Sequence, residues 1–416
     1  MTNIKRFIGS NGERFAILLD SEGKPLTYPN LYATINFRNR GLSINSIVAV
    51  LEDIKLLLQL CKDLKINIEQ RIQMKCFLKL EEIECISNLA NFKREYLIKR
   101  KDEKFLTFPT SLKKESIRSK FYFNKNDYIS KELVCRRLSN FSEYIEWLEF
   151  YFHPSCSTNN KSFFKNRKPK IPTNVSTDYK SFNVQQLSKI LETIDPKNKD
   201  RVWQTDFLSF RNELIVYLFL YLGCRKGELL NITILDIVEI DNVKLLSNKQ
   251  FKVGALYINI RRKHDDNTDT RLYQPLVKTR DRSIAVNLKL REKLENYIIK
   301  YRSLIKNAEL TDFLIISNQG KALSISALNK IFLKISKQTS FNVHAHAFRH
   351  TWNDKFTEKS QKLISSGDTT ENRVEGDRSY LMGWAVGSQS ARRYSKRAEN
   401  ERAINIGLAI QSEFEE

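Results

Sequence analysis

The first apolar run of the chain is short and is followed closely by turn-forming residues. Phe15 to Asp20 has the pattern of a strand, and Ser21 to Lys24 has the composition of a turn. The residues from Pro25 onward are expected to return as a second strand. Residues 1–43 are therefore predicted to form a small N-terminal appendage with a β-hairpin.

Helical periodicity dominates the next hundred residues. Ser43 offers a helix N-cap, and a run of apolar residues three and four positions apart follows it. The members of this run are Ile47, Val50, Leu51, Ile54, Leu57 and Leu58. Further helices are expected from about Leu80 to Leu97 and from about Ser130 to Phe152. Together these segments predict a helical domain over residues 44–152.

The pattern breaks at residue 153. Residues 153–180 are polar and contain prolines, with five lysines and one arginine between Lys161 and Lys180. Such a composition is typical of a linker between domains. Its charge would also suit contact with a phosphate backbone.

Residues 181–416 have the pattern of a second globular domain. The helix expected from Phe207 to Leu222 is apolar on nearly every side, which indicates burial. Further helices are expected, the last from about Ala398 to Glu413. Leu256 to Arg261 alternates as a strand would.

A β-hairpin is expected in the same domain. Residues 272–277 and 282–286 have strand character and flank a turn at Lys278 to Asp281. The predicted fold class is thus mainly α with a small antiparallel β-sheet, in which a helical domain precedes a mixed α+β domain.

Charge indicates the kind of partner. Lysine and arginine number 70 and aspartate and glutamate 48 in 416 residues, so the formal net charge is +22. A strong positive charge predicts an acidic partner, of which nucleic acid is the commonest. The 41% of hydrophobic residues excludes wholesale disorder.

Several other classes are disfavoured. No apolar run is long enough to span a bilayer, and the N-terminus lacks the apolar core of a secretory signal, so a cytoplasmic protein without a membrane partner is expected. No G-x-x-x-x-G-K-[ST] segment is present, which disfavours a P-loop ATPase. The six cysteines show no C-x-x-C spacing and are expected to be reduced, mostly buried thiols.

Four short segments carry residues that could perform chemistry. The first is Leu222-Gly-Cys-Arg-Lys-Gly-Glu-Leu229, the second lies in the predicted hairpin turn, the third is His344-Ala-His-Ala-Phe-Arg-His-Thr351, and the fourth runs from Leu381 to Tyr394. The candidate residues are Arg225, Lys278, His346, Arg349, Trp384 and Tyr394. Taken singly, each could equally be an ordinary surface or core residue. Glu228, in the first segment, is expected to pair with a nearby basic group or with backbone amides.

The three histidines of the third segment also raise the question of a metal. His346 and His350 lie four residues apart, a spacing that two zinc ligands on a helix can have. No glutamate follows His346 as in H-E-x-x-H, and Arg349 between the two ligands would repel a cation. A zinc site is therefore disfavoured.

Taken in order, the segments resemble the tyrosine recombinase (phage integrase) family. That family shows an arginine in a G-x-R-x-x-E-L context, a hairpin lysine, an H-x-x-R-H-T box, a G-[H/W] pair and a tyrosine about ten residues later. All five elements occur here, within about 170 residues. The clear resemblance covers about residues 181–400 and extends more loosely to residues 44–152, which are similar to the family's core-binding domain. Residues 1–43 resemble no part of the family.

The sequence departs from the family pattern in three places. Trp384 stands where most members carry histidine. The segment from Gln361 to Asp377 is long and polar, and we expect it to form a loop at the rim of the cleft. Lys263, in a lengthened β-connection, is a rival to Lys278 for the lysine role.

The resemblance implies a reaction mechanism. Arg225 and Arg349 would clamp a phosphodiester and stabilise its negative charge in the transition state, while Tyr394 attacks the phosphorus. His346 would accept or relay the tyrosine proton, and Lys278 would protonate the leaving 5′ oxygen. His350 is a weaker candidate that hydrogen-bonds the phosphate or supports Arg349, and Trp384 can donate its indole N–H to a phosphate oxygen.

The 3′-phosphotyrosine product would conserve the energy of the phosphodiester, so neither ATP nor a metal or other cofactor is expected. The implied protein is a site-specific recombinase, an integrase of a mobile genetic element. Its partner would be double-stranded DNA, bound by a homotetramer with accessory DNA-bending proteins as possible helpers. Two alternatives stay open: an enzyme similar to type IB topoisomerases, and a non-catalytic DNA-binding protein that retains the fold. The amphipathic helix after Tyr394 could dock on a neighbouring protomer or on its own domain.

Overall fold

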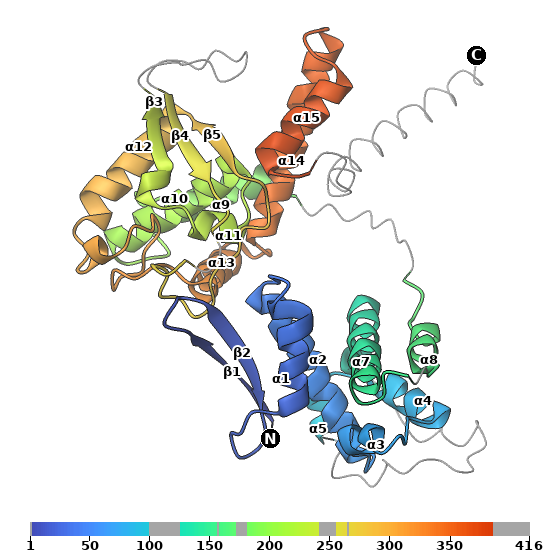
Figure 1. Cartoon of the computed structure of the whole chain (residues 1–416). Coiled ribbons are helices and arrows are strands. Elements are labelled where there is room, and N and C mark those ends of the chain that lie inside the picture. The colour runs from blue at the N-terminus through green and yellow to red at the C-terminus, as the bar shows by residue number, and fades with distance from the viewer. Residues whose placement is uncertain are drawn as a thin grey trace, which may run out of the picture. The chain divides into compact units, whose positions relative to one another are not determined.

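The computed structural model describes residues 2–99, 125–155, 158–171, 181–240, 255–263 and 266–385 (Figure 1). The chain divides into two compact units, Met1–Val175 and Ser176–Glu416. Helices dominate and the two sheets are small and antiparallel, which confirms the predicted fold class. None of the helices in the described part of the chain has the length and apolar character needed to cross a bilayer.

The first unit begins with a hairpin of β1 (Asn3–Ile8) and β2 (Arg14–Leu19). The predicted return strand after Pro25 is wrong, because β2 pairs with the strand before it, and α1 (Thr27–Ala33) follows. Asn30 gives the physical reason. Its side chain accepts a hydrogen bond from the Leu18 amide (2.7 Å) and donates one to the Leu18 carbonyl (2.9 Å), so a helical residue occupies the free edge of β2.

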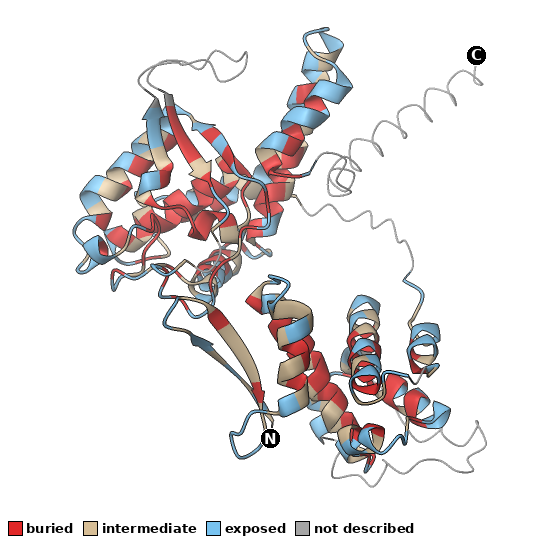
Figure 2. Cartoon of the chain, in the orientation of Figure 1, coloured by how far each residue is buried: buried red, intermediate tan, exposed pale blue. Residues whose placement is uncertain are grey.

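Two long helices form the core of the first unit. They are α2 (Ile44–Asp63) and α7 (Lys131–Phe152), and their apolar faces lie in one cluster of buried residues (Figure 2). Ser43 and Ser130 cap them, each accepting a hydrogen bond from the amide three residues on, and the cap at Ser43 is the one that the sequence predicts. The hairpin packs on α2 through a smaller cluster, whose buried members are Leu18, Ala33, Ile47 and Leu51.

Shorter helices occur elsewhere in the described part of the unit. They are the π-helical turn Thr34–Arg38, α3 (Ile68–Gln73), α4 (Leu80–Leu89), α5 (Arg94–Lys99), the 3-10 turn Lys125–Asp127 and α8 (Asn160–Asn166). The single helix expected from Leu80 to Leu97 is interrupted, because Asn91 and Lys93 form backbone hydrogen bonds with Ile129 and Asp127. α8 lies inside the segment predicted as a linker, and its Phe164 is fully buried in the core of the first unit.

The second unit is built around α10 (Asp206–Leu222), which has buried residues on nearly every side, as its apolar sequence predicts. α9 (Val184–Ile194), α12 (Leu288–Asn296) and α14 (Ala345–Ser365) pack against it. Other helices among the described residues are α11 (Lys226–Leu230), the π-helical stretch Tyr297–Arg302, α13 (Ile325–Thr339) and α15 (Glu371–Met382), and two short 3-10 turns, Ile234–Asp236 and Ala308–Leu310, accompany them. The expected rim loop from Gln361 to Asp377 is wrong, since α14 and α15 occupy most of it.

One three-stranded antiparallel sheet accompanies these helices, in the order β3 (Ile237–Ile240), β4 (Ala255–Ile260), β5 (Arg282–Val286). The hairpin predicted between 272–277 and 282–286 is wrong, because β5 pairs with β4 and 272–277 form no strand.

Side-chain anchors explain why 272–277 form no strand. The buried Arg271 donates hydrogen bonds to the carbonyls of Leu230 and Leu323, and Asn231 donates one to the carbonyl of Pro275 (2.5 Å). These contacts attach the segment to the end of α11 and use carbonyls that lie outside the sheet.

The approach of this segment to α11 is unusually close at Gly227. A Cβ atom at Gly227 would lie 2.2 Å from the carbonyl oxygen of Leu276. Because the obstacle is backbone, no side-chain rotation could relieve the contact. Glycine at this position therefore lets the chain before Lys278 lie directly against the helix that begins after Arg225.

We predict that Gly227→Ala lowers the free energy of unfolding by about 1–3 kcal/mol or more, as overpacking of a rigid site does. Gly376→Ala is the matched control, since Gly376 lies in α15 with open space where its Cβ would be. That change should raise the free energy of unfolding by about 0.5–1 kcal/mol through helix propensity. Urea denaturation of the full chain, followed by far-UV circular dichroism, measures both. Equal effects of the two substitutions would contradict the close-approach argument.

Candidate active site

Arg225 lies where two helices meet. α10 ends at Gly223 in the left-handed conformation (φ 58°), the buried Cys224 follows, and Arg225 is the N-cap of α11. The Arg225 amide donates a hydrogen bond to Glu228 Oε2 (3.0 Å), and its Nη1 lies 3.4 Å from Glu228 Oε1. Its side chain is 34% exposed, so an anion can reach the guanidinium from solvent.

Arg349 lies in the first turns of α14, which begins with His344 as N-cap. The Arg349 side chain is 0% exposed. Its Nη1 donates to the carbonyl of Gly223 (2.7 Å) and its Nη2 to the carbonyl of Met382 (3.1 Å). Backbone atoms from two distant segments therefore fix the orientation of this guanidinium.

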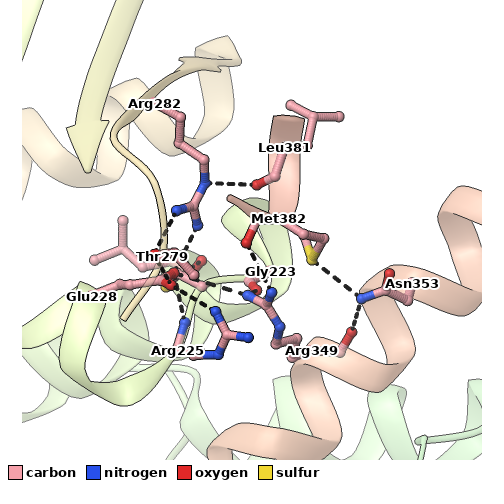
Figure 3. Close-up of polar contacts among 11 residues, drawn as sticks. Gly223, Arg225, Glu228, Thr279, Arg282, Arg349, Asn353, Leu381 and Met382 are labelled. Carbon is pink, nitrogen blue, oxygen red and sulfur yellow. Dashed lines mark hydrogen bonds and ion pairs between the residues drawn. The ribbon is translucent and has the colours of Figure 1, made fainter. Parts of the chain in front are cut away.

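Glu228 connects the two arginines. Its carboxylate is 3.4 Å from Arg225 and 3.9 Å from Arg349, and it also pairs with Arg282 Nη2 (2.7 Å) and accepts from Thr279 Oγ1 (2.8 Å) (Figure 3). This confirms the expectation that Glu228 pairs with basic groups and a backbone amide. We call these five residues the Glu228 cluster.

The cluster is electropositive. Three guanidinium groups share one carboxylate, so its members carry a formal charge of +2. Burial acts to raise the pKa of Glu228, but the charges of Arg282 and Arg349 and the hydrogen bonds from Arg225 and Arg282 outweigh it and lower the pKa. Glu228 therefore stays ionised at neutral pH, and the surplus positive charge of the cluster can attract a phosphate group.

The two candidate lysines have different surroundings. Lys278 is exposed and directly precedes Thr279 of the Glu228 cluster. Lys263 is mostly buried, and its Nζ lies 3.1 Å from the buried carboxylate of Asp236. The ion pair gives Lys263 a structural role, whereas Lys278 lies beside the cluster with its side chain exposed.

Trp384 is brought to the same place by the turn after α15. Its ring lies 5.5 Å from the Arg349 guanidinium carbon, a cation–π contact. Gly383, before it, has φ 66°, and its carbonyl accepts a hydrogen bond from the Arg280 amide (3.0 Å). A Cβ there would lie 2.7 Å from Arg282 Nη1, so glycine allows the turn to pack against the loop that carries Lys278.

His346 lies one turn before Arg349 on α14 and is exposed. Its ring packs edge-to-face with that of His350, with centroids 4.8 Å apart. Within the residues that the structure describes, no three or more histidine, cysteine or acidic side chains lie together as metal ligands would. Tyr394 and the helix expected after it lie outside the described residues.

Two members of the cluster, Thr279 and Arg282, were not among the residues picked out from the sequence. Arg282 is the first residue of β5, and its side chain is 1% exposed. One signal was available: Arg282 shares a strand face with the apolar Ile284, because side chains two apart point to the same side. An arginine on a core-facing position needs a buried anion, and Glu228 supplies it.

Comparison with known proteins agrees with this geometry. Residues 180–363 match the Phage integrase family. The matched segment is similar to that family, the tyrosine recombinases, whose members catalyse site-specific DNA recombination. No curated protein matches the sequence.

Several solved structures are similar to the chain. XerH recombinase bound to a palindromic difH substrate is 18% identical, with 91% of this chain and 93% of that chain covered and a TM-score of 0.42. A lambda integrase dimer bound to a COC′ core site is 13% identical, with 94% and 93% covered and a TM-score of 0.47. The Tn1549 transposon integrase in complex with circular intermediate DNA is 15% identical, with 90% and 99% covered and a TM-score of 0.47.

We predict that Glu228→Gln lowers the free energy of unfolding by about 3–5 kcal/mol at pH 7, because it breaks a buried ion-pair cluster. The pKa of Glu228 is lower in the folded than in the unfolded chain, whose carboxyl has a pKa near 4.5. The stabilisation is therefore fully present above pH 4.5 and is lost as pH falls through the folded-state pKa. Denaturation from pH 7 to pH 3 should show the gap between wild type and variant shrinking below pH 4.5.

Glu358→Gln is the control for this prediction. Glu358 forms ion pairs with Lys355 and Lys362 on the surface of α14 and is exposed. Its loss should leave the free energy of unfolding nearly unchanged at pH 7. A gap between wild type and Glu228→Gln that stays constant across the pH range would contradict the role of the ionised carboxylate.

Proposed function

We propose that the chain cuts and rejoins duplex DNA at specific sites through a covalent 3′-phosphotyrosine intermediate on Tyr394. The observation that supports it best is the Glu228 cluster, in which guanidiniums from segments more than a hundred residues apart share one carboxylate. Attack on a phosphodiester adds negative charge to the non-bridging oxygens. Fixed guanidiniums stabilise that charge because each presents parallel N–H donors.

The two arginines would divide the work. Arg225 is partly exposed and would meet the phosphate directly, while the buried Arg349 is oriented by the carbonyls of Gly223 and Met382 and supplies charge beneath it. Trp384 packs on Arg349 and would donate its indole N–H to a phosphate oxygen when DNA is bound. Removing one such charge-stabilising donor typically slows a reaction by about 10²–10³-fold.

Two proton transfers accompany the exchange. A tyrosine phenol ordinarily has a pKa of about 10, so the phenol of Tyr394 would lose a proton as it attacks. His346, which lies one helical turn before Arg349, would accept that proton. The leaving 5′ oxygen takes a proton from the Lys278 ammonium. His350, which packs on His346, would hydrogen-bond the phosphate or support Arg349. One P–O bond forms as another breaks, so rejoining requires no ATP.

The partner would be double-stranded DNA, bound by both units. The net charge of +22 suits phosphate contacts along a duplex, and residues 44–152 would serve as the core-binding domain. A lambda integrase tetramer bound to a Holliday junction is one of the similar solved structures. We propose the same stoichiometry here, with four protomers acting on two duplexes of a mobile element.

The decisive experiment captures covalent protein–DNA complexes. The chain is incubated with a pool of nicked duplexes in excess EDTA, washed under denaturing conditions, and the attached DNA is sequenced. We expect Tyr394→Phe to abolish the adduct and to leave DNA binding nearly intact, because only the phenol oxygen is lost. Gel-shift and denaturing electrophoresis measure the two properties.

Tyr380→Phe is the matched control, since Tyr380 is an exposed tyrosine on α15 in the same unit. It should keep the adduct. An adduct that survives in Tyr394→Phe and disappears in Tyr380→Phe would refute the choice of nucleophile. Relaxation of a supercoiled plasmid without the captured sequence would favour a topoisomerase.

The lysine assignment has its own test. Lys278→Ala should slow single-turnover cleavage by about 10²–10⁴-fold, the usual contribution of general acid–base catalysis. Lys263→Ala should cleave at the wild-type rate but unfold at lower urea, because it leaves the buried Asp236 without its ammonium partner. The reverse pattern would transfer the acid role to Lys263.

A further inference from the structure

The Lys278 side chain is long and exposed, so the loop that carries it needs an anchor. An exposed lysine samples many rotamers, and a proton donor must lie within hydrogen-bond reach of the leaving oxygen. The contacts of the neighbouring residues show where the loop is attached.

The attachment begins at the next residue. Thr279 is buried, and its hydroxyl donates to Glu228 Oε1 (2.8 Å). Arg282 Nη1 lies 3.3 Å from the same hydroxyl, and Arg282 Nη2 pairs with the other carboxylate oxygen of Glu228 (2.7 Å). Thr279 is thus held from two sides by a charged pair that is itself almost fully buried.

The opposite side of the loop is attached to the turn that carries Trp384. Arg282 Nε donates to the carbonyl of Leu381 (2.7 Å), and the Arg280 amide donates to the carbonyl of Gly383 (3.0 Å). The loop after Lys278 is therefore fixed to both segments that carry proposed phosphate-binding groups (Figure 3).

We propose that Thr279 and Arg282 are positioning residues that act through Lys278, by holding its loop where the ammonium reaches the 5′ leaving oxygen. The inference rests on the proposed function. In the step concerned, the Tyr394 oxygen bonds to phosphorus, the bond from phosphorus to the 5′ oxygen breaks, and the Lys278 proton passes to that oxygen. Thr279 and Arg282 exchange no proton themselves.

A substrate with sulfur in place of the bridging 5′ oxygen separates this role from general structural support. A thiolate leaves without being protonated, because a thiol is a far stronger acid than an alcohol. Loss of the proton donor therefore slows the oxygen substrate but not the sulfur substrate. Loss of charge stabilisation at the phosphate slows both.

The primary variant is Thr279→Val, which removes the hydroxyl at nearly constant shape and keeps the Arg282–Glu228 ion pair. We expect it to slow single-turnover cleavage of the captured target, as an oxygen substrate, by at least about tenfold, and by no more than the 10²–10⁴-fold that loss of general acid catalysis typically costs. On the sulfur substrate it should recover to near the wild-type rate. Lys278→Ala should behave in the same way, and Thr279→Ser should restore cleavage of the oxygen substrate.

Arg225→Ala is the contrasting variant and should be slow on both substrates. Arg282→Lys is a second probe, which retains the charge beside Glu228 but loses the guanidinium contacts with Thr279 and Leu381. It should show the same sulfur rescue as Thr279→Val. Gel-shift titration at one salt concentration and urea denaturation check that each variant binds DNA and folds.

The outcomes are distinct. The positioning role alone is overturned if Thr279→Val cleaves the oxygen substrate at the wild-type rate. It is also overturned if Thr279→Val stays slow on the sulfur substrate while Lys278→Ala is rescued. Lys278→Ala that is not rescued by sulfur overturns the acid role of Lys278, and the positioning role with it. A wild-type chain that forms no adduct with either substrate overturns the proposed function itself.

Discussion

A buried carboxylate is the constraint on which the second unit depends. Glu228 is 1% exposed, and an ionised carboxylate out of water is costly unless cations and hydrogen bonds surround it. The fold meets this requirement with groups from α11, α14, β5 and the loop before β5. Once the carboxylate is satisfied, three segments distant in sequence (α11, the stretch from Thr279 to Arg282, and α14) have fixed relative positions.

The same requirement explains why the arginines are useful for chemistry. One anion cannot neutralise three guanidiniums, so the cluster keeps a surplus of positive charge. Positive charge that is held in place before substrate arrives needs little reorganisation during the reaction. The stability of the fold and the proposed binding of phosphate therefore draw on one set of contacts.

Local features of this molecule were readable from the sequence, and long-range pairing was not. The serine cap of α2, the approximate bounds of α7, the apolar surface of α10 and the overall class all follow from short-range pattern. The pairing of β5 with β4 could not be predicted in this way. A loop separates the two strands, and the anchored Arg271 sets the course of that loop. The prediction of a return strand after Pro25 was wrong for a similar reason, because the Asn30 side chain of α1 occupies the edge of β2 where that strand was expected.

The candidate site shows the same division. Arg225, Lys278, Arg349 and Trp384 were picked out by the order of motifs, and the structure gathers Arg225, Arg349 and Trp384 and places Lys278 next to them. The sequence gives no strong signal for Arg282, because an arginine at the start of a strand is usually exposed to solvent. Its pairing with Glu228 spans 54 residues, and no local pattern reports a contact of that kind.

Main-chain atoms do much of the holding in this site. Gly223 and Gly383 both end helices in the left-handed conformation, and their carbonyls accept from Arg349 and from the Arg280 amide. A backbone carbonyl is present whichever side chains surround it. The neighbouring side chains can therefore be substituted while these backbone hydrogen bonds are kept. Descendants of this chain could therefore diverge widely in sequence and change what they recognise without losing the Glu228 cluster, provided that both glycines are retained.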